Sequence, residues 1–314
     1  MKNYPSIALG TWSWGTGAAG GDQVFGNQLS VEELKPVFDA AIKAGLNLWD
    51  TALVYGMGAS EKILGEFVEQ CKRENLILST KFTPQIVGAF GNNADEMFAI
   101  SCGNLHTDYI DLYWIHNPAN VEMWTPQLLP LLKSGKVKSV GVSNHNLSQI
   151  KRANEILGAE GFRISAVQNH YSLLYRSSEK AGILDYCKEN DIAFFAYMVL
   201  EQGALSGKYD TTHPLPAGSQ RGSTYNPLLP QIEALISTMK AISEKHKVGV
   251  PQIAVAWAIA KGTTPIIGVT KPQHVTDAVT AMQVKLSAEE VRELENIAEQ
   301  SNVDTRGSWE NPMA

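Results

Sequence analysis

The sequence lacks several features that mark common classes of protein. Its three cysteines, among 314 residues, are widely spaced and odd in number: Cys71, Cys102 and Cys187. This spacing disfavours structural disulfides and a cysteine zinc site, so we expect a reducing compartment. No stretch approaches 18 consecutive apolar residues, and no charged segment leads into an apolar run at the N-terminus. We therefore expect neither a membrane span nor a signal peptide, and a cytoplasmic location.

The chain also lacks an excess of positive charge. Its 26 Lys and Arg residues against 32 Asp and Glu give a net charge of −6. This balance argues against nucleic acid or a membrane surface as a partner, although a local basic patch can still bind a phosphate ligand. No Pro- or Ser-rich linker interrupts the chain, so we expect one domain over residues 1–314. The composition favours a protein that acts on a small molecule, and it leaves open whether that protein is a monomer or an oligomer.

Eight short apolar runs, each followed by a loop and a helical pattern, are the main structural signal. The predicted strands are residues 7–11, 46–50, 77–81, 110–116, 139–143, 166–169, 193–197 and 265–268. Between the first two, a helix over residues 31–44 begins with a capping box of Ser30 and Glu33 and ends at Gly45. Such strands predict an α/β fold in which a parallel sheet closes into a (β/α)₈ TIM barrel. An open doubly wound sheet is the alternative, disfavoured because no G-x-G-x-x-G follows the first strand.

Reactive polar side chains stand at the C-terminal ends of these strands. Asp50 and Tyr55 follow the second strand, Lys81 ends the third and His116 ends the fourth. Because the carboxyl ends of barrel strands converge on one mouth, we expect the four side chains to share a pocket. There Asp50 would be the counter-charge of Lys81, whose ammonium would lower the pKa of the Tyr55 phenol. The phenol could then protonate, and His116 orient, an oxygen that becomes negative, such as a carbonyl receiving hydride from a nicotinamide.

Each of these residues also has a simpler structural interpretation. Alone, Asp50 is more often a helix cap, Tyr55 a half-buried ring, Lys81 a solvated strand end and His116 a structural histidine. The four matching positions together favour catalysis. Among the aromatic residues that could line a substrate pocket, Trp12 and Trp124 are favoured because they fall in loops or at a strand end. The others, Trp14, Phe82 and Trp114, fit the core as well.

Seven segments resemble motifs of the aldo-keto reductase superfamily, in order and at similar spacing over nearly the whole chain. They are GTWSWG, LWDTALVYGMGASEKILGE, STKF, DYIDLYWIHNP, GKVKSVGVSNH, VQNHYSLL and EQGALSGKY. The resemblance implies a (β/α)₈ barrel that reduces an aldehyde or ketone to an alcohol with NADPH. It implies that Tyr55 is the general acid, that Lys81 and Asp50 lower its pKa, and that His116 orients the substrate carbonyl. Trp12 and Trp124 would join Tyr55 and His116 in contacting the substrate.

The same resemblance implies where NADP(H) would bind. Ser143, Asn144 and Gln168 correspond to residues that hold the nicotinamide carboxamide, and Tyr197 to a ring that stacks on the nicotinamide. The loop over residues 200–205 corresponds to the one that clasps the pyrophosphate. In chain order the implied cofactor contacts are Thr11, Trp12, Asp50, Ser143, Asn144, Gln168, Tyr197, Leu200, Gln202, Gly203, Leu205, Lys208, Arg221, Gly268, Thr270, Lys271 and His274.

The segment GVTKPQH, residues 268–274, falls where the superfamily binds the adenosine phosphate, and it has a physical case of its own. Gly268 and Thr270 precede a predicted helix start near Pro272, and a helix N-terminus attracts phosphate. Lys271 and His274 could add charge and hydrogen bonds for a 2′-phosphate. This pattern favours NADP over NAD.

Some positions depart from the pattern of the superfamily. The usual Tyr-Ser-Pro-Leu after the seventh strand is Tyr-Met-Val-Leu over residues 197–200, an adenine-contacting Asn is Ala278, and an Arg or Gln near the phosphate is His274. Cofactor affinity would then be weaker or its selectivity looser. Only six residues precede the first strand, so the N-terminal hairpin of many relatives would be short or missing.

Two other functional classes are carried as alternatives. One is an NADP(H)-binding sensor or regulatory subunit with little turnover, as the potassium-channel β-subunits of this superfamily allow. The other is a metal-dependent hydrolase using His116 and Asp50, for which the sequence offers no HxH or clustered carboxylates. Substrate choice would belong to residues 82–93, 117–124 and 199–230 and to the tail beyond Asn302, which either drapes over the barrel mouth or is disordered.

Overall fold

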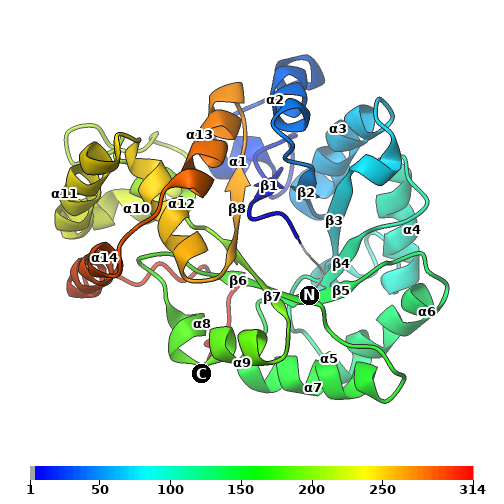
Figure 1. Ribbon diagram of the computed structural model, residues 1–314. Coiled ribbons are helices and arrows are strands. Elements are labelled where there is room, and N and C mark those ends of the chain that lie inside the picture. The colour runs from blue at the N-terminus through cyan, green and yellow to red at the C-terminus, as the bar shows by residue number, and fades with distance from the viewer. Residues whose placement is uncertain (1–3, 314) are drawn as a thin grey trace.

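The computed structural model describes residues 4–313, which build a closed barrel of parallel strands (Figure 1). The strands are β1 (Ala8–Gly10), β2 (Leu48–Asp50), β3 (Ile77–Phe82), β4 (Leu112–Ile115), β5 (Val140–Ser143), β6 (Ala166–His170), β7 (Ala193–Tyr197) and β8 (Thr264–Gly268). Each strand pairs with the next, and β8 pairs with β1, so within residues 4–313 none of these eight strands is left at a sheet edge. The predicted barrel is confirmed, with strand ends that differ from the predicted ones by no more than two residues.

Helices alternate with the strands and surround the barrel (Figure 1). They are α1 (Gly21–Phe25), α2 (Val31–Lys43), α3 (Ala59–Val68), α4 (Ala94–Asn104), α5 (Val121–Trp124), α6 (Leu128–Lys133), α7 (Leu147–Gly158), α8 (Ser177–Lys180), α9 (Ile183–Glu189), α10 (Gln220–Tyr225), α11 (Leu229–His246), α12 (Val250–Ala260), α13 (Pro272–Gln283) and α14 (Ala288–Gln300). Short 3₁₀ turns lie between them: η1 (Tyr55–Gly58), η2 (Arg73–Asn75), η3 (Pro84–Ile86), η4 (Thr125–Gln127), η5 (Glu201–Ser206) and η6 (Asn226–Leu228).

Local sequence explains where several helices begin. The capping box predicted for α2 is present, because the Ser30 side chain accepts from the Glu33 amide and the Glu33 carboxylate accepts from the Ser30 amide.

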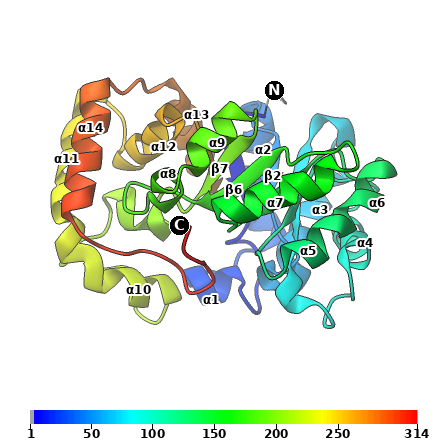
Figure 2. The same ribbon diagram turned by 90° about the horizontal axis from the view of Figure 1, so that it is seen from below.

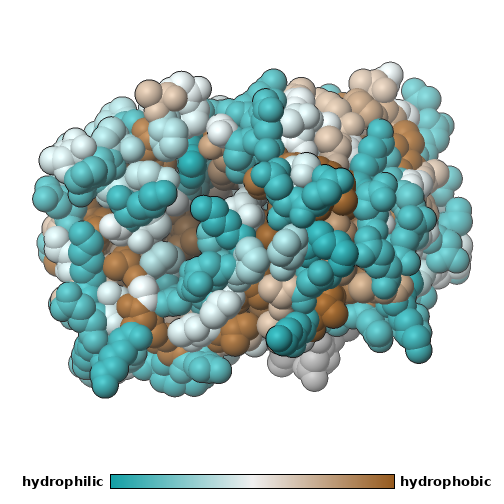
Figure 3. Space-filling model, turned by 90° about the horizontal axis from the view of Figure 1, so that it is seen from above, coloured by the Kyte–Doolittle hydropathy of each residue, from teal (hydrophilic) through white to brown (hydrophobic). Residues whose placement is uncertain are grey.

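Helix α12 is apolar on all sides because it packs against β8, α11, α13 and η5. Within residues 4–313, no helix is long and apolar enough to cross a bilayer. The face shown in Figure 3 is mostly hydrophilic, with hydrophobic residues in scattered patches.

The barrel interior is filled by side chains and is not a channel. Trp114 and Phe195 meet edge to face inside it, with ring centroids 5.4 Å apart. Gly141 makes room for the indole, because a Cβ there would lie 2.4 Å from the Trp114 ring. At the N-terminal end, Tyr4 packs against Phe195 at 5.3 Å and its hydroxyl bonds to Ser139. With this end filled, a ligand site at the C-terminal mouth is favoured.

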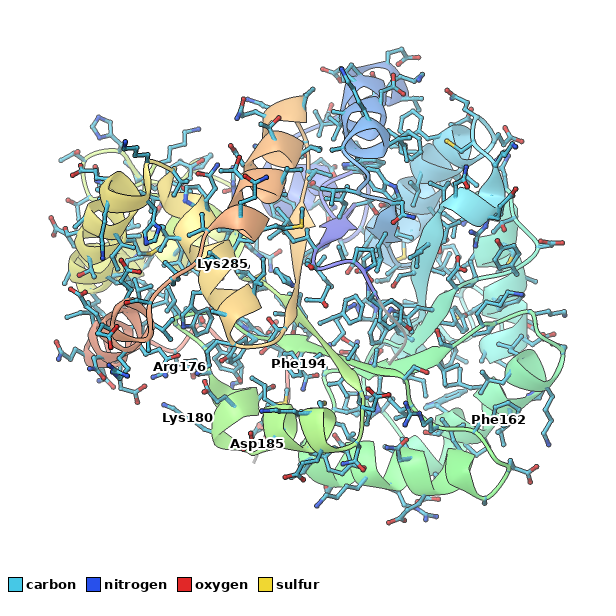
Figure 4. The ribbon with its side chains drawn as sticks, viewed as in Figure 1. Phe162, Arg176, Lys180, Asp185, Phe194 and Lys285 are labelled. Carbon is cyan, nitrogen blue, oxygen red and sulfur yellow. The ribbon has the colours of Figure 1, made fainter. Side chains whose placement is uncertain are left out.

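The C-terminal tail, residues 302–313, leaves α14 and runs back to the ends of β6 and β7 (Figure 2). The end of α14, from which the tail starts, is held by its own contacts, since Arg176 and Lys180 each form an ion pair with Glu299 at 2.7 Å. Figure 4 labels Arg176 and Lys180. The far end of the tail is fixed by Met313, whose side chain is 1% exposed and contacts the Asn169 amide. Of the two alternatives left by the sequence, the tail therefore drapes over the barrel.

Candidate active site

A buried ion pair lies at the mouth of the barrel. Lys81, from β3, is fully buried, and its ammonium lies 2.6 Å from an Asp50 carboxylate oxygen. Asp50, at the end of β2, also accepts hydrogen bonds from the Ser79 hydroxyl at 2.7 Å and from the Gln168 amide at 3.0 Å. Because Gln168 belongs to β6, the carboxylate is held from both sides of the barrel. Asp50 is thus neither a helix cap nor a loop anchor.

Tyr55 lies next to this pair. Its hydroxyl oxygen is 3.3 Å from the Lys81 ammonium, which also donates to the Thr51 carbonyl at 2.7 Å. The tight turn that brings the phenol here needs glycine, because Gly56 has φ of 58° and a Cβ on it would lie 2.7 Å from the Thr16 carbonyl oxygen. The sequence predicted that Tyr55, Lys81 and Asp50 lie close together, and the structure places them in contact.

The direction of the Tyr55 pKa differs from the sequence-based expectation. Burial raises the pKa of the phenol more than the positive charge of Lys81 lowers it, so the net pKa lies above its ordinary value. For Lys81 the balance is different: burial lowers its pKa, but Asp50 and Tyr55 outweigh that effect and raise it. Lys81 lowers the phenol pKa as expected, but the expected net lowering is wrong because the larger effect of burial was left out. At neutral pH the site holds a neutral phenol beside an ammonium.

His116 completes the group of four side chains. Its ring meets the Tyr55 ring edge to face, with centroids 5.9 Å apart. Burial first, and then the charge of Lys81, lower the His116 pKa well below its ordinary value, so the imidazole is neutral. Its Nδ1 atom lies 2.9 Å from the Thr83 hydroxyl. In the tautomer in which Nδ1 accepts from Thr83, Nε2 carries the hydrogen and can donate it to a ligand oxygen.

Aromatic side chains surround the phenol. The Trp12 ring stacks on the Tyr55 ring at 5.7 Å and 23°. The edges of Phe25 at 5.4 Å and Trp309 at 6.0 Å face Trp12. By contrast, Trp14, Phe82 and Trp114 are fully buried core residues, and Trp124 packs on Phe82 at 5.1 Å. Two tryptophans were expected at the substrate site. The structure places Trp12 in contact with Tyr55, whereas Trp124 packs on Phe82, the residue after Lys81.

Polar residues predicted to hold a carboxamide lie beside this group. Ser143 and Gln168 are register partners on β5 and β6, and both are almost fully buried. Asn144, with φ of 60°, donates from its side-chain amide to the His116 carbonyl at 3.0 Å. The Tyr197 hydroxyl, at the end of β7, lies 2.6 Å from the Asn144 amide oxygen. These residues form one connected layer at the mouth. The Thr11 hydroxyl adjoins this layer by donating a hydrogen bond to the Asp50 carbonyl.

The loop after β7 carries basic groups near strained backbone. Arg221 donates to the Gln202 carbonyl at 3.2 Å, and its guanidinium lies 3.6 Å from where a Cβ on Gly203 would be. Its Nε atom is buried without a hydrogen-bond partner in the described part of the chain. Lys208 is exposed and lies over the Tyr209 ring. Arg221 is partly buried, and a guanidinium with an unused donor fits an anionic group such as a pyrophosphate. Leu205 belongs to the core, and Leu200 packs against it.

The segment between β8 and α13 has the predicted form. Helix α13 begins at Pro272, with Lys271 as its N-cap residue. The Lys271 side chain is exposed, and Gly268 lies at the surface where an added Cβ would meet no atom. His274 is half-buried and its Nδ1 accepts from the Thr270 amide at 3.2 Å. A helix N-terminus with an adjacent lysine and open space fits a phosphate group.

Sequence reasoning missed several residues of this mouth. Thr83, next to His116, gave no motif, and His170 was part of a quoted segment without being assigned a role. Glu310 and Trp309 belong to the tail, which carries no periodic pattern, yet both contact the Tyr197 hydroxyl, at 3.0 and 3.4 Å.

Within the described residues, no group of three or more His, Cys, Asp or Glu side chains could hold a metal ion.

Comparison with known proteins agrees with this geometry. The profile of the aldo/keto reductase family matches residues 6–299. A chloroplastic pyridoxal reductase from Arabidopsis thaliana is 30% identical, over 94% of this chain and 83% of that protein. An aldo-keto reductase from Gibberella moniliformis is also 30% identical, over 91% of this chain and 90% of that protein. A solved aldo-keto reductase from Klebsiella pneumoniae, in complex with NADPH, shares the fold with a TM-score of 0.73 at 24% identity, over 94% of this chain and 91% of that chain. This chain, with its buried Asp50–Lys81 pair beside Tyr55, belongs to the aldo/keto reductase family.

Proposed function

We propose that the protein is an NADPH-dependent oxidoreductase that reduces an aldehyde or ketone to an alcohol, with Tyr55 as the general acid. Membership of the family supports an oxidoreductase that uses a nicotinamide cofactor. The observation that carries the finer proposal is the phenol of Tyr55, 3.3 Å from a buried ammonium that is itself 2.6 Å from Asp50. His116 lies against the same phenol.

Each side chain has a defined part in this reaction. Bound NADPH would supply hydride to the carbonyl carbon, and negative charge would develop on the carbonyl oxygen. Tyr55 is protonated at neutral pH and would transfer its proton to that oxygen. The Lys81 ammonium would stabilise the phenolate left behind, and Asp50 holds that ammonium in place. Neutral His116 would donate a hydrogen bond to the same oxygen and fix its position.

We propose NADP(H) as the cofactor from this chain's own residues. Ser143, Asn144 and Gln168 would bind the carboxamide after exchanging part of their present hydrogen bonds, and Tyr197 would lie against the nicotinamide. The unused donor of Arg221 favours a pyrophosphate at the loop after β7. The exposed Lys271 at the start of α13 favours a 2′-phosphate, and with it NADP over NAD.

The alternative is an NADP(H)-binding sensor or regulatory subunit with little turnover. One observation favours it: the tail already contacts the Tyr197 hydroxyl through Glu310 and Trp309, which restricts access to that face of the site. The intact arrangement of Tyr55, Lys81 and Asp50 favours turnover instead. We therefore keep the reductase as the leading proposal.

A single set of measurements separates the two functions. The purified protein is mixed with NADPH and a panel of aldehydes and ketones that includes pyridoxal, because one relative is a pyridoxal reductase. The reductase predicts loss of nicotinamide absorbance with at least one member of the panel. Tight NADPH binding without turnover on any member would support the sensor, and no binding at all would contradict both.

We also propose that the protein works in the cytoplasm as a small-molecule enzyme. Its three cysteines are free thiols. Burial raises the pKa of Cys102 and Cys187 to about 12, which makes them unreactive under neutral conditions. Free thiols of this kind fit a reducing compartment, and fractionation of cells that express the tagged protein would test the assignment.

A further inference from the structure

A fully buried histidine at the end of β6 lies between two fully buried carboxylates. His170 Nε2 is 3.0 Å from a Glu201 oxygen, and His170 Nδ1 is 3.0 Å from a Glu310 oxygen. None of the three side chains is exposed. Burial lowers the pKa of His170, but the two carboxylates outweigh it and raise the pKa to about 9. At neutral pH an imidazolium therefore donates to both carboxylates at once.

The first carboxylate holds the loop after β7. Glu201 also accepts hydrogen bonds from the Ser172 hydroxyl, from Tyr225 at 2.7 Å and from Thr305 at 3.1 Å. Its backbone φ is 46°, a left-handed conformation that side chains other than glycine rarely adopt. Such strain persists only where surrounding contacts fix it, and here the buried carboxylate supplies those contacts. Glu201 thus fixes the start of the loop expected to bind the pyrophosphate.

The second carboxylate holds the tail over the mouth. Glu310 contacts the Tyr197 hydroxyl at 3.0 Å, and the neighbouring Trp309 donates to the same hydroxyl at 3.4 Å. The Tyr197 ring in turn stacks on the His170 ring, with centroids 5.5 Å apart. His170 therefore supports Tyr197 directly through the ring and indirectly through the tail.

We propose that His170 is a positioning residue that joins the tail to the loop after β7, so that tail docking and dinucleotide binding strengthen each other. The inference rests on the proposed function, because Tyr197 and this loop are the expected cofactor contacts. A dinucleotide that binds the loop after β7 fixes Glu201, which lies in that loop. A dinucleotide that packs on Tyr197 fixes the hydroxyl that Glu310 contacts. Since coupling between two binding events is reciprocal, a docked tail must then tighten the dinucleotide by the same factor.

A cluster with a purely structural role would behave differently. It would add stability without linking the tail to the cofactor. The tail can be released without unfolding the barrel, because α14 is held separately by Arg176 and Lys180 through Glu299. Glu310→Gln is therefore a variant that should keep its fold. Asp304→Asn is the matched control, because it makes the same carboxylate-to-amide change at an exposed position of the same tail.

The experiment measures hydrogen–deuterium exchange of the tail peptides in the full-length protein, with and without NADPH. In the wild type, NADPH should slow exchange over residues 302–313. In Glu310→Gln and His170→Gln this protection should be lost, and the Kd for NADPH should rise about tenfold, within the range of about 5- to 150-fold expected of such coupling. In steady state the rise in KM for NADPH should exceed the fall in kcat. Asp304→Asn should match the wild type within about twofold.

Two results would overturn the inference. If NADPH binds to the wild type and carbonyls are reduced, but tail exchange does not respond to NADPH, the coupling does not exist and the proposed reductase stands. If Glu310→Gln keeps the wild-type protection of the tail and the wild-type Kd for NADPH, the contacts of His170 with Glu201 and Glu310 do not carry the coupling. This conclusion holds whether or not His170→Gln folds. Failure of the wild type to bind NADPH would instead remove the proposed function and the inference together.

Discussion

Replacing Lys81 with methionine removes a buried positive charge while nearly keeping the side-chain volume. The ammonium lies 3.3 Å from the Tyr55 hydroxyl oxygen. With an effective dielectric constant of about 20, a unit charge at this distance stabilises a phenolate by about 5 kcal/mol. Removal of one preorganised stabilising group typically costs about 10²- to 10³-fold in kcat. We therefore expect kcat for carbonyl reduction to fall by about 10³ in Lys81→Met.

The same change should also lower stability, and a second substitution separates the two effects. Lys81→Met leaves Asp50 buried without its counter-charge, which typically costs about 3–5 kcal/mol of unfolding free energy. In the double variant Asp50→Asn with Lys81→Met, both charges are gone, so stability should recover by about half or more. The kcat should remain low, because the phenolate still lacks its ammonium. The exposed Lys133, paired with Glu160, is the control: Lys133→Met should change stability by less than about 1 kcal/mol.

The assay combines urea unfolding with nicotinamide absorbance at saturating NADPH and aldehyde. If Lys81→Met keeps more than a third of the wild-type kcat, the ammonium does not stabilise the transition state and the reasoning fails. If the double variant regains both stability and kcat, the loss in the single variant came from misfolding and not from missing charge.

Three further predictions follow from the site and its surroundings. Thr83→Val removes the hydroxyl at His116 Nδ1, so kcat should fall by about tenfold with KM for NADPH unchanged; a wild-type kcat would show that the hydroxyl does not orient the ring. Lys271→Gln should raise KM for NADPH by about tenfold and leave KM for NADH unaltered, because only NADPH carries the 2′-phosphate; equal effects on both would contradict this. Burial lowers the pKa of His145 from 6.5 to about 4, so the unfolded chain binds the proton first, and stability should drop by about 3 kcal/mol as pH falls from 6.5 to 4. Urea midpoints that decline as steeply in His145→Asn would assign that drop to other groups.

A parallel sheet covered by helices on both faces was predictable because its strands are too apolar to face water. Residues 112–115, for example, read Leu-Tyr-Trp-Ile and are buried on both faces of the sheet. A strand with no polar face must be covered on both sides, which restricts it to the interior of an α/β fold. Closure into a barrel was favoured over an open sheet by the eight strands, by polar residues at the ends of many of them, and by the missing G-x-G-x-x-G motif. Local capping signals such as Ser30 and Glu33 set the helix starts.

The meeting of Tyr55, Lys81, Asp50 and His116 was predictable for a similar reason. Parallel strands in a barrel all point their carboxyl ends the same way, so the position of a residue at a strand end is enough to place it at the mouth. The direction of the Tyr55 pKa was not predictable in this way. It depends on how deeply the phenol is buried, and tertiary packing, including the stacked Trp12 ring, decides that.

The His170 cluster could not be found from the sequence. Its partners lie 31 and 140 residues away, in a strained turn and in a tail without periodicity. Nothing in the residues around Glu201 or Glu310 indicates that either carboxylate is buried. A histidine at the end of β6 is the only local signal, and a single histidine there is as easily a structural one. The conformation of the tail had to be seen before the cluster could be recognised.

The most direct test of the central claim is single-turnover hydride transfer in Tyr55→Phe. The protein is preloaded with NADPH and mixed with an aldehyde in a stopped-flow instrument, with Tyr186→Phe, a partly exposed tyrosine on α9, as the control. We predict that Tyr55→Phe binds NADPH within about threefold of the wild type but transfers hydride about 10³-fold more slowly, while Tyr186→Phe matches the wild type. Hydride transfer at the wild-type rate in Tyr55→Phe would show that the phenol is not the acid.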